Sequence, residues 1–191
     1  MENNSSPPDT WLQQSRRLDW RFCLPSPQLK RVAYWGPDDN SLVESLKLFA
    51  QDLIRIDSST PTSIEVDLMV LVNPSVREFR HYLNLVHPTE GFYAEVPRHT
   101  RTDPSRIVFP YAYRHAAKQL GFQEMDCFWH YPNFEEPTRI IPVSSATPLV
   151  HVMSKGKTDL KTQLKQLVII TASRSGILAR ITPYTSVMGW R

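Results

Sequence analysis

The chain has little glycine, little cysteine and no long hydrophobic run. Its 191 residues include 6 glycines against 16 prolines, which indicates fixed turns and extended segments rather than flexible loops. The 2 cysteines, Cys23 and Cys127, lie far apart, so the sequence offers neither a disulfide framework nor a zinc-binding C-x-x-C pair. We therefore expect buried thiols and no metal cofactor.

The sequence also lacks a targeting segment and a strong excess of charge. The N-terminus has neither the basic nor the apolar region of a secretory signal, and the longest apolar stretch near the C-terminus, residues 167–171, is too short to span a bilayer. The formal net charge of +3 is too small to indicate a nucleic-acid partner or an acidic lipid surface. These absences predict a cytoplasmic protein with no membrane span and no nucleic-acid partner.

The remaining composition is that of one folded domain with additions at both ends. A hydrophobic content of 41% and an aromatic content of 10% exclude a wholly disordered chain. Residues 1–15 are polar and proline-containing, which predicts a flexible tail. Apolar residues alternate with polar ones from Leu18 to Leu24, so we expect residues 16–30 to form an extended arm. Residues 31–150 are predicted to be the domain, and residues 151–191 a C-terminal helical extension.

Within the predicted domain, short apolar runs alternate with segments of helical periodicity. The run at 66–72 is almost continuously apolar, which indicates a strand buried on both faces, as in a parallel sheet covered by helices. Ser41 and Glu44 have the S-x-x-E spacing of a helix capping box. The expected elements are strands at 31–35, 53–57, 66–72 and 91–97, helices at 41–50, 76–86 and 111–120, and an antiparallel pair within 124–143. This order predicts an α/β domain with a mostly parallel sheet.

The carboxyl ends of parallel strands meet at one edge of a sheet, where ligands of such domains bind. We therefore expect the segments that follow the strands to converge on one rim. These segments are Gly36 to Asn40, Asp57, Asn73 to Ser75 and the loop after Val96.

The layout and three segments resemble the class I S-adenosylmethionine (SAM) dependent methyltransferases. The segment 32–36 resembles that family's first motif, Asp57 is placed like the acid that holds the cofactor ribose, and 67–73 is similar to the fourth-strand motif. The pair within 124–143 matches the antiparallel end of the family's sheet, so the resemblance covers about residues 30–145. It implies a Rossmann-like fold and SAM as the cofactor. The cofactor-binding residues that it implies are Gly36, Asp38, Asn40, Asp57 and Asn73.

The sequence departs from the family's pattern at two places. Tyr34 stands where the first motif has an acid, and Asp38 and Asn40 stand where it has further glycines, which let the backbone pass close to the cofactor. Asp67 follows Asp57 by only ten positions, which is too short for the crossover that normally builds the adenine-binding wall. These departures predict a reduced cofactor site.

Two functions remain open from the sequence. The first is a binding or scaffold module, a pseudoenzyme that docks a protein partner through its aromatic N-terminal arm or its C-terminal helix. The second is an active small-molecule methyltransferase, for which His130 and Glu95 are the candidate general bases. A SAM pocket between Gly36, Asp57 and Asn73 would favour the enzyme, and a pocket filled by side chains such as Tyr34 would favour the binding module.

Overall fold

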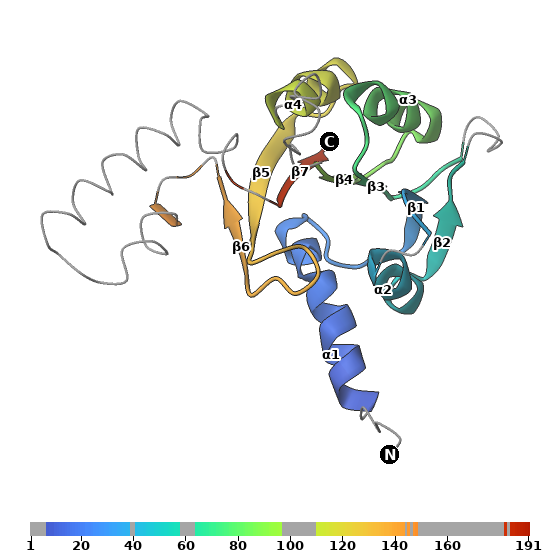
Figure 1. The fold of residues 1–191 in the computed structure, drawn as a ribbon. Coiled ribbons are helices and arrows are strands. Elements are labelled where there is room, and N and C mark those ends of the chain that lie inside the picture. Colours follow the sequence, from blue (N-terminus) through green and yellow to red (C-terminus); the bar gives the residue numbers. More distant parts are fainter. Residues whose placement is uncertain are drawn as a thin grey trace, which may run out of the picture.

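The computed structural model describes residues 7–38, 41–57, 64–96, 110–143, 145, 147–148, 182 and 184–191. One mixed sheet of seven strands runs through this part of the chain, with helices on both of its faces (Figure 1). The helices are α1 (Pro7–Arg17), the 3-10 helix η1 (Asp19–Cys23), α2 (Ser41–Phe49), α3 (Val76–Val86) and α4 (Pro110–Gln119). The strands are β1 (Arg31–Trp35), β2 (Asp52–Arg55), β3 (Leu68–Val72), β4 (Gly91–Glu95), β5 (Glu124–Tyr131), β6 (Arg139–Pro142) and β7 (Thr185–Trp190).

The sheet confirms the predicted α/β architecture. Its strand order is β2-β1-β3-β4-β7-β5-β6. The pairs β1/β2, β1/β3 and β3/β4 are parallel, and the pairs that involve β7 or β6 are antiparallel. The molecule is thus a Rossmann-like α/β fold with an antiparallel end. β3 is buried along its whole length, as its continuous apolar run predicts.

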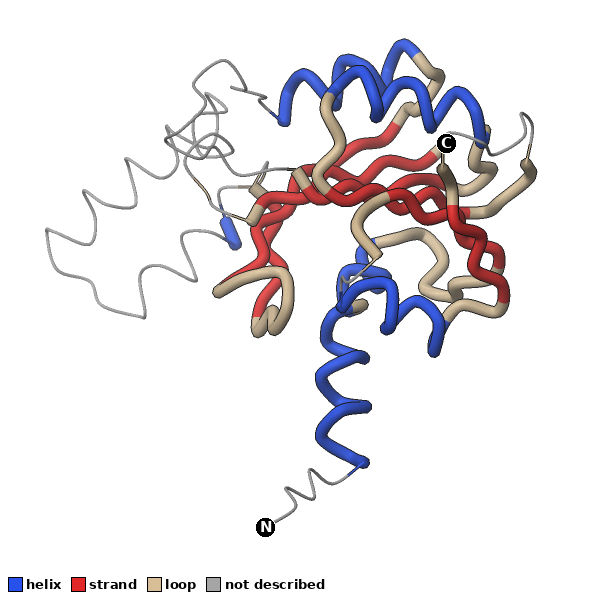
Figure 2. Tube along the Cα trace, turned by 45° about the vertical axis from the view of Figure 1, so that its right-hand side comes forward, coloured by secondary structure: helices blue, strands red, loops and turns tan. Residues whose placement is uncertain are grey.

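Alternate residues of each strand supply two separate cores. Val32 and Val70 face a core that includes residues of η1 and α2, whereas Ala33 and Leu71 face a core formed with α3 and α4. Figure 2 shows the consequence, with α3 and α4 above the sheet and α1 and α2 below it. The helices expected at 41–50, 76–86 and 111–120 are present within one residue of their predicted bounds.

The expectation for the N-terminal segment is wrong. Residues 7–17 form α1 and residues 19–23 form η1, where we expected a loose tail and an extended arm. Pro7 is compatible with this helix, because proline is favoured in the first helical turn, where its missing N–H is not needed. The alternating apolar residues lie in a tight helical turn instead of a strand. This turn buries Leu18 and Trp20 and leaves Phe22 exposed.

The C-terminal strand β7 is the second correction. Residues 151–191 were expected to be helical, but residues 185–190 form a strand in the middle of the sheet, between β4 and β5. The helix expected around residues 160–168 and the loop expected at 58–63 lie outside the described residues. The structure has no helix long and apolar enough to cross a membrane among its described residues.

The capping box predicted at Ser41 and Glu44 is also wrong. The Ser41 hydroxyl contacts the carboxylate of Glu135, and Glu44 pairs instead with Lys47. Ser41 is the first residue of α2 rather than the residue before the helix, so its side chain is not placed to cap the first turn.

Candidate functional site

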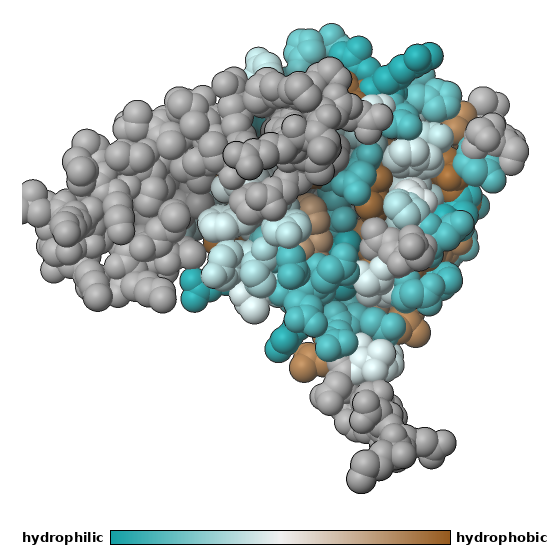
Figure 3. Space-filling view, viewed as in Figure 1, coloured by the Kyte–Doolittle hydropathy of each residue, from teal (hydrophilic) through white to brown (hydrophobic). Residues whose placement is uncertain are grey.

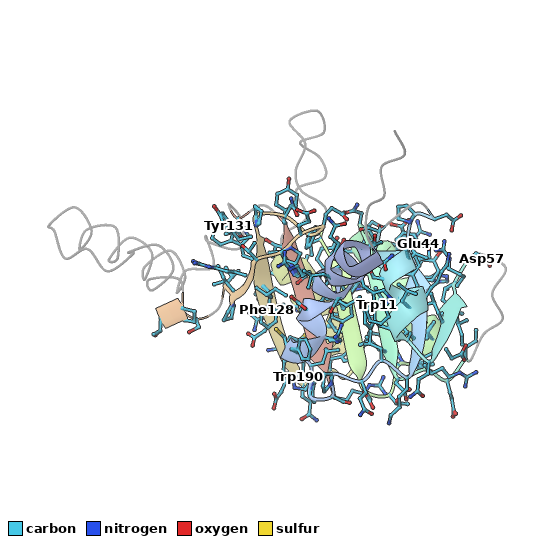
Figure 4. All side chains as sticks on the ribbon, turned by 90° about the horizontal axis from the view of Figure 1, so that it is seen from below. Trp11, Glu44, Asp57, Phe128, Tyr131 and Trp190 are labelled. Atoms are coloured by element: carbon cyan, nitrogen blue, oxygen red, sulfur yellow. The ribbon has the colours of Figure 1, made fainter. Side chains whose placement is uncertain are left out.

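The carboxyl ends of the parallel strands meet at one rim, as predicted. Gly36 follows β1, Asp57 lies two residues after β2, Asn73 follows β3, and Glu95 ends β4. The backbone N–H of Asn73 donates to the carbonyl of Glu95 over 3.0 Å, so the ends of β3 and β4 lie side by side. Figure 4 shows how wide the sheet is, with Asp57 beside β2 at one end and Tyr131, at the end of β5, at the other.

The loop after β1 is closed by side chains of the chain itself. The buried Tyr34 donates a hydrogen bond from its hydroxyl to the carbonyl of Pro37 over 3.0 Å. The guanidinium of Arg55 lies 4.7 Å from the centre of the Tyr34 ring. The same guanidinium donates to the Gly36 carbonyl over 3.3 Å and pairs with the carboxylate of Asp38. Arg55 therefore contacts both Tyr34 and Asp38 at the position of the expected cofactor loop.

Gly36 itself is held in a conformation that suits only glycine. Its φ is +156°, and a Cβ there would lie 2.7 Å from the Tyr34 hydroxyl and 2.8 Å from Cβ of Val72. The glycine thus permits a close approach between the loop, Tyr34 and the end of β3. This approach involves protein atoms, and it explains the glycine without a ligand.

These residues do not fit SAM in the way that the family resemblance implies. The cofactor carries a cationic ammonium group and a sulfonium, which an acid at position 34 would attract, but Tyr34 has no charge and its hydroxyl is used by Pro37. Arg55 places a cation beside the loop and already forms an ion pair with the carboxylate of Asp38, which could otherwise attract the cationic groups of SAM. Asp57 and Asn73 are exposed at the rim, and Asn40 lies outside the described residues.

The Asn73-Pro74-Ser75 segment is a strand end followed by a helix start. Asn73 has a φ of +52°, and Ser75 is the N-cap of α3. The Ser75 hydroxyl accepts from the N–H of Glu78 over 3.2 Å, and the Glu78 carboxylate accepts from the N–H of Ser75 over 2.7 Å. These bonds form a complete capping box, which accounts for the side chain of Ser75 without a ligand.

A buried ion pair lies at the rim on the α1 side of the sheet. Nη1 of Arg17, which is 2% exposed, lies 2.6 Å from Oε1 of Glu95, and the Tyr93 hydroxyl donates to the same carboxylate over 3.0 Å. Burial opposes the charge of Arg17, but Glu95 and Tyr93 outweigh it, so the pKa of Arg17 is raised. Burial, reinforced by the carboxylate of Glu95, raises the pKa of Tyr93 well above its ordinary value. Arg17 is therefore charged, and the carboxyl group of Glu95 is its main partner.

His130 lies beside this ion pair and is neutral. Its Nε2 is 2.8 Å from Oγ of Ser186, and its ring centre is 4.8 Å from that of Phe134. Burial, together with the nearby charge of Arg17, lowers the pKa of His130 to about 3. Within the described part of the chain, its Nδ1 has no hydrogen-bond partner. An imidazole with so low a pKa is a weak base near neutral pH, because efficient general bases titrate near the working pH.

The structure therefore brings Glu95 and His130 into one buried cluster with Arg17, Tyr93 and Ser186. Sequence reasoning missed these last three residues. The period of two along β4 places Tyr93 on the same face as Glu95, so this neighbour could have been found from the strand pattern. Arg17 and Ser186 had no such signal, because they come from a helix and a strand that were not predicted.

The cluster is closed on its outer side by a loop and by η1. Nε of Arg17 donates to Oγ of Ser41 over 3.2 Å and lies 3.6 Å from Glu135. The ring of Trp20 stacks on that of Tyr93, with centres 3.9 Å apart and planes 8° apart. These contacts leave Glu95 3% exposed and His130 fully buried.

Cys127 is buried, as expected, whereas Cys23 is only partly buried. Burial raises the pKa of Cys127 to about 11, and burial together with Asp126 raises that of Cys23. Both therefore stay protonated near neutral pH. The described residues contain no group of three or more His, Cys, Asp or Glu side chains placed to hold a metal ion.

Sequence comparison with protein-family models and with curated proteins found no match. Among solved structures, the chain is similar to a protein from Galdieria sulphuraria described as a candidate sarcosine dimethylglycine methyltransferase. The two are 11% identical, with a TM-score of 0.42 over 99% of this chain and 86% of that chain. It is also similar to a SAM-dependent methyltransferase from Thermotoga maritima described as a possible histamine N-methyltransferase. That pair is 8% identical, with a TM-score of 0.42 over 96% of this chain and 93% of that chain.

Proposed function

We propose that this protein is a binding module that keeps a methyltransferase-like fold without SAM-dependent methyl transfer. The observation that carries the proposal is the closed loop after β1. The side chains of Tyr34, Arg55 and Asp38 are engaged with one another where the family resemblance places cofactor contacts. Opening the loop for SAM would separate Arg55 from Asp38 and leave its cation beside the cationic sulfonium.

The two candidate bases support the same proposal. Glu95 is held by Arg17 and Tyr93, and His130 is neutral and bound to Ser186. Both side chains lie under α1 and η1, where neither reaches solvent. A base must lie within hydrogen-bond reach of the proton that it removes, and burial separates these two groups from a substrate at the surface.

The partner surface that we propose is on the N-terminal side of the molecule. We define the N-terminal aromatic patch as Trp11, Phe22 and Phe49 with the guanidinium of Arg21 between them. Trp11 is 56% exposed and Phe22 64% exposed. The Trp11 and Phe49 rings lie 4.9 Å apart, and Arg21 lies 4.6 Å from the centre of Phe22 and 5.2 Å from that of Phe49. Exposed aromatic and arginine side chains of this kind anchor protein interfaces.

Figure 3 shows one face of the molecule. On that face, hydrophilic residues predominate, and apolar residues form separate patches, two of them at the lower end of the body where Figure 1 places α1 and α2. Of the aromatic residues expected on the N-terminal arm, Phe22 of η1 is exposed, whereas Trp20 is fully buried. The C-terminal helix, the other surface expected to bind a partner, lies outside the described residues.

Calorimetric titration with SAM and with its demethylated product tests the absence of a cofactor site. We expect no saturable heat at millimolar ligand and no rise in melting temperature. A bound ligand at about 100 times its dissociation constant would add roughly 2.7 kcal/mol of stability, which is easily measured. Saturable binding that disappears in Asp57→Ala would overturn the proposal and support the alternative, an active small-molecule methyltransferase.

The binding role is tested with the same full-length chain. A partner captured by the wild type should be lost by the double variant Trp11→Ala/Phe22→Ala, whose melting temperature should stay unchanged because both side chains are exposed. The double variant Leu48→Ala/Tyr131→Ala, which removes two other exposed side chains, is the matched control. Equal recovery by wild type and both variants would exclude the N-terminal aromatic patch as the interface.

A further inference from the structure

A groove runs between α3 and α4, on the opposite face of the sheet from the N-terminal aromatic patch. It encloses about 690 Å³. Its floor is apolar and comprises Val76, Ala116 and Leu120, of which Ala116 is fully buried. Its walls are polar and exposed, and they include Arg77, Arg80, His81, Asn84 and Gln119. Figures 1 and 2 show the two helices side by side above the sheet.

Arg77 and Arg80 line the groove, and they have no counter-ion among the residues that the structure describes. α3 and α4 together bear four cationic side chains, Arg77, Arg80, Arg114 and Lys118, against the single carboxylate of Glu78. That carboxylate is engaged in the capping box of α3. Within the described part of the chain, none of the four cations forms an ion pair. This surface is therefore a local excess of positive charge on a molecule whose overall excess is small.

One of these cations is already held in place by the groove. Nη2 of Arg80 donates to Oε1 of Gln119 over 2.6 Å, and Nε2 of Gln119 lies 3.1 Å from Nε2 of His115. The first bond joins the two helices and holds the Arg80 guanidinium at the edge of the groove, and the second, within α4, orients Gln119. Arg77 lies one helical turn earlier on α3 and is free to take a separate carboxylate.

We propose that the groove between α3 and α4 binds an acidic, amphipathic segment of a partner protein. The apolar side chains of the segment would enter the floor, as in other complexes in which an amphipathic helix lies in a groove, and its carboxylates would pair with Arg77 and Arg80. Because the groove combines an apolar floor with guanidinium groups that lack an ion-pair partner, we expect its occupant to carry both apolar side chains and carboxylates. This proposal does not depend on whether the rim binds SAM.

Two other anionic ligands fit the groove less well. A free phosphate would use backbone N–H groups at a helix N-terminus, but at α3 the N–H groups of Ser75 and Glu78 are already engaged in the capping box, and the Glu78 carboxylate repels anions. The phosphates of a nucleic acid would pair with the arginines, but its backbone binds through charge and would leave the apolar floor uncovered. Both ligands are tested below.

The test measures fluorescence anisotropy of labelled peptides added to the full-length chain. The probe is a helical peptide with Leu at positions i, i+4 and i+7 and Glu at the positions between them. We expect saturable binding, and dissociation constants roughly tenfold higher or more for Arg77→Glu/Arg80→Glu, because each substitution replaces an attraction with a repulsion. The matched control is Lys30→Glu/Arg139→Glu, which makes the same change of net charge at exposed cations outside the groove and should alter binding less than about twofold.

A scrambled peptide of the same composition, without the apolar periodicity, separates charge from shape. We expect it to bind at least about tenfold more weakly than the amphipathic peptide. Equal binding of the two peptides, equal weakening by both double variants, or no binding of either peptide would overturn the proposal. Tighter binding of a labelled single-stranded oligonucleotide, or competition by inorganic phosphate at equal ionic strength, would also overturn it in favour of the other anions.

Discussion

His130 shows how burial changes the chemistry of a single side chain. The sequence places this histidine near carboxylates at the end of a strand, which suggests a general base. In the folded protein it is enclosed by Phe134, Tyr93 and Ser186, with the positive charge of Arg17 nearby. Protonation of His130 is therefore unfavourable in the folded protein, which makes folding stability depend on pH through this residue.

The first prediction concerns the pH dependence of stability. The pKa of His130 is about 3 in the folded chain and about 6.5 in an unfolded one, so between these values the unfolded chain binds one more proton. Stability must therefore rise as pH increases from about 3 to about 6.5, with a slope of roughly 1.4 kcal/mol per pH unit from this residue. Urea unfolding between pH 4 and 8 should show a steeper dependence for the wild type than for His130→Gln, which keeps a hydrogen-bonding side chain.

Carboxylates also titrate in this range, so the difference between the wild type and His130→Gln is more informative than the pH dependence of either protein alone. The difference in their slopes should vanish above about pH 7, where the histidine of the unfolded chain is neutral too. Parallel curves at all pH values would show that His130 is accessible to protons in the folded protein.

At the scale of the element, a buried ion pair joins the end of α1 to the sheet. Leu18 and Trp20 fill a core that contains Tyr93, while Arg17 at the end of α1 reaches Glu95 at the end of β4. Both charged groups are almost wholly removed from solvent, so each is costly without the other. The ion pair therefore fixes where α1 lies and keeps Glu95 and His130 covered.

The second prediction follows from this pair. Arg17→Ala leaves the Glu95 carboxylate buried and unpaired, which should lower the free energy of unfolding by about 3–5 kcal/mol. Arg31→Ala, which breaks the exposed pair with Asp52, should cost less than about 1 kcal/mol and is the control. Arg17→Met/Glu95→Gln removes both charges and should be more stable than Arg17→Ala alone. An Arg17→Ala protein as stable as Arg31→Ala would show that the ion pair is not closed in solution.

At the scale of the whole molecule, the end of the chain completes the middle of the sheet. β7 pairs with β4 on one side and with β5 on the other, so it joins the parallel half to the antiparallel end. In Figure 4 its last residue, Trp190, lies at the opposite edge of the sheet from Tyr131, as an antiparallel strand requires. Without this strand, β4 and β5 would each expose a row of unpaired backbone groups.

The third prediction uses the close approach of β7 to β4. A Cβ at Gly91 would lie 2.4 Å from the backbone carbonyl oxygen of Gly189, which cannot yield without moving the strand. We expect Gly91→Ala to lower the free energy of unfolding by about 3 kcal/mol, at the upper end of the usual cost of overpacking. Gly121→Ala is the control, since it meets no atom within 4 Å and only its φ of +89° is unfavourable, which should cost about 1 kcal/mol. Equal losses for the two variants would show that β4 and β7 are farther apart than described.

Local sequence patterns were sufficient for much of this protein. The strands β1, β3 and β4 and the helices α2, α3 and α4 follow from apolar runs and helical periodicity, because each pattern buries its own side chains on a known face. The convergence of Gly36, Asp57 and Asn73 on one rim follows in turn, since parallel strands end at the same edge. The departure of Tyr34 and Asp38 from the methyltransferase pattern is also visible in the sequence alone.

Only the tertiary structure decided what these residues contact. β7 has no distinctive pattern, and its place between β4 and β5 depends on pairing with strands far away in the chain. Arg17 was expected at the start of an extended arm, and its ion pair with Glu95 arises because a helix brings it across the rim. The pairing of Arg55 with Asp38 and the burial of His130 are likewise long-range. Sequence patterns record which face a side chain takes, whereas partners, burial and proton affinity depend on the elements packed against that face.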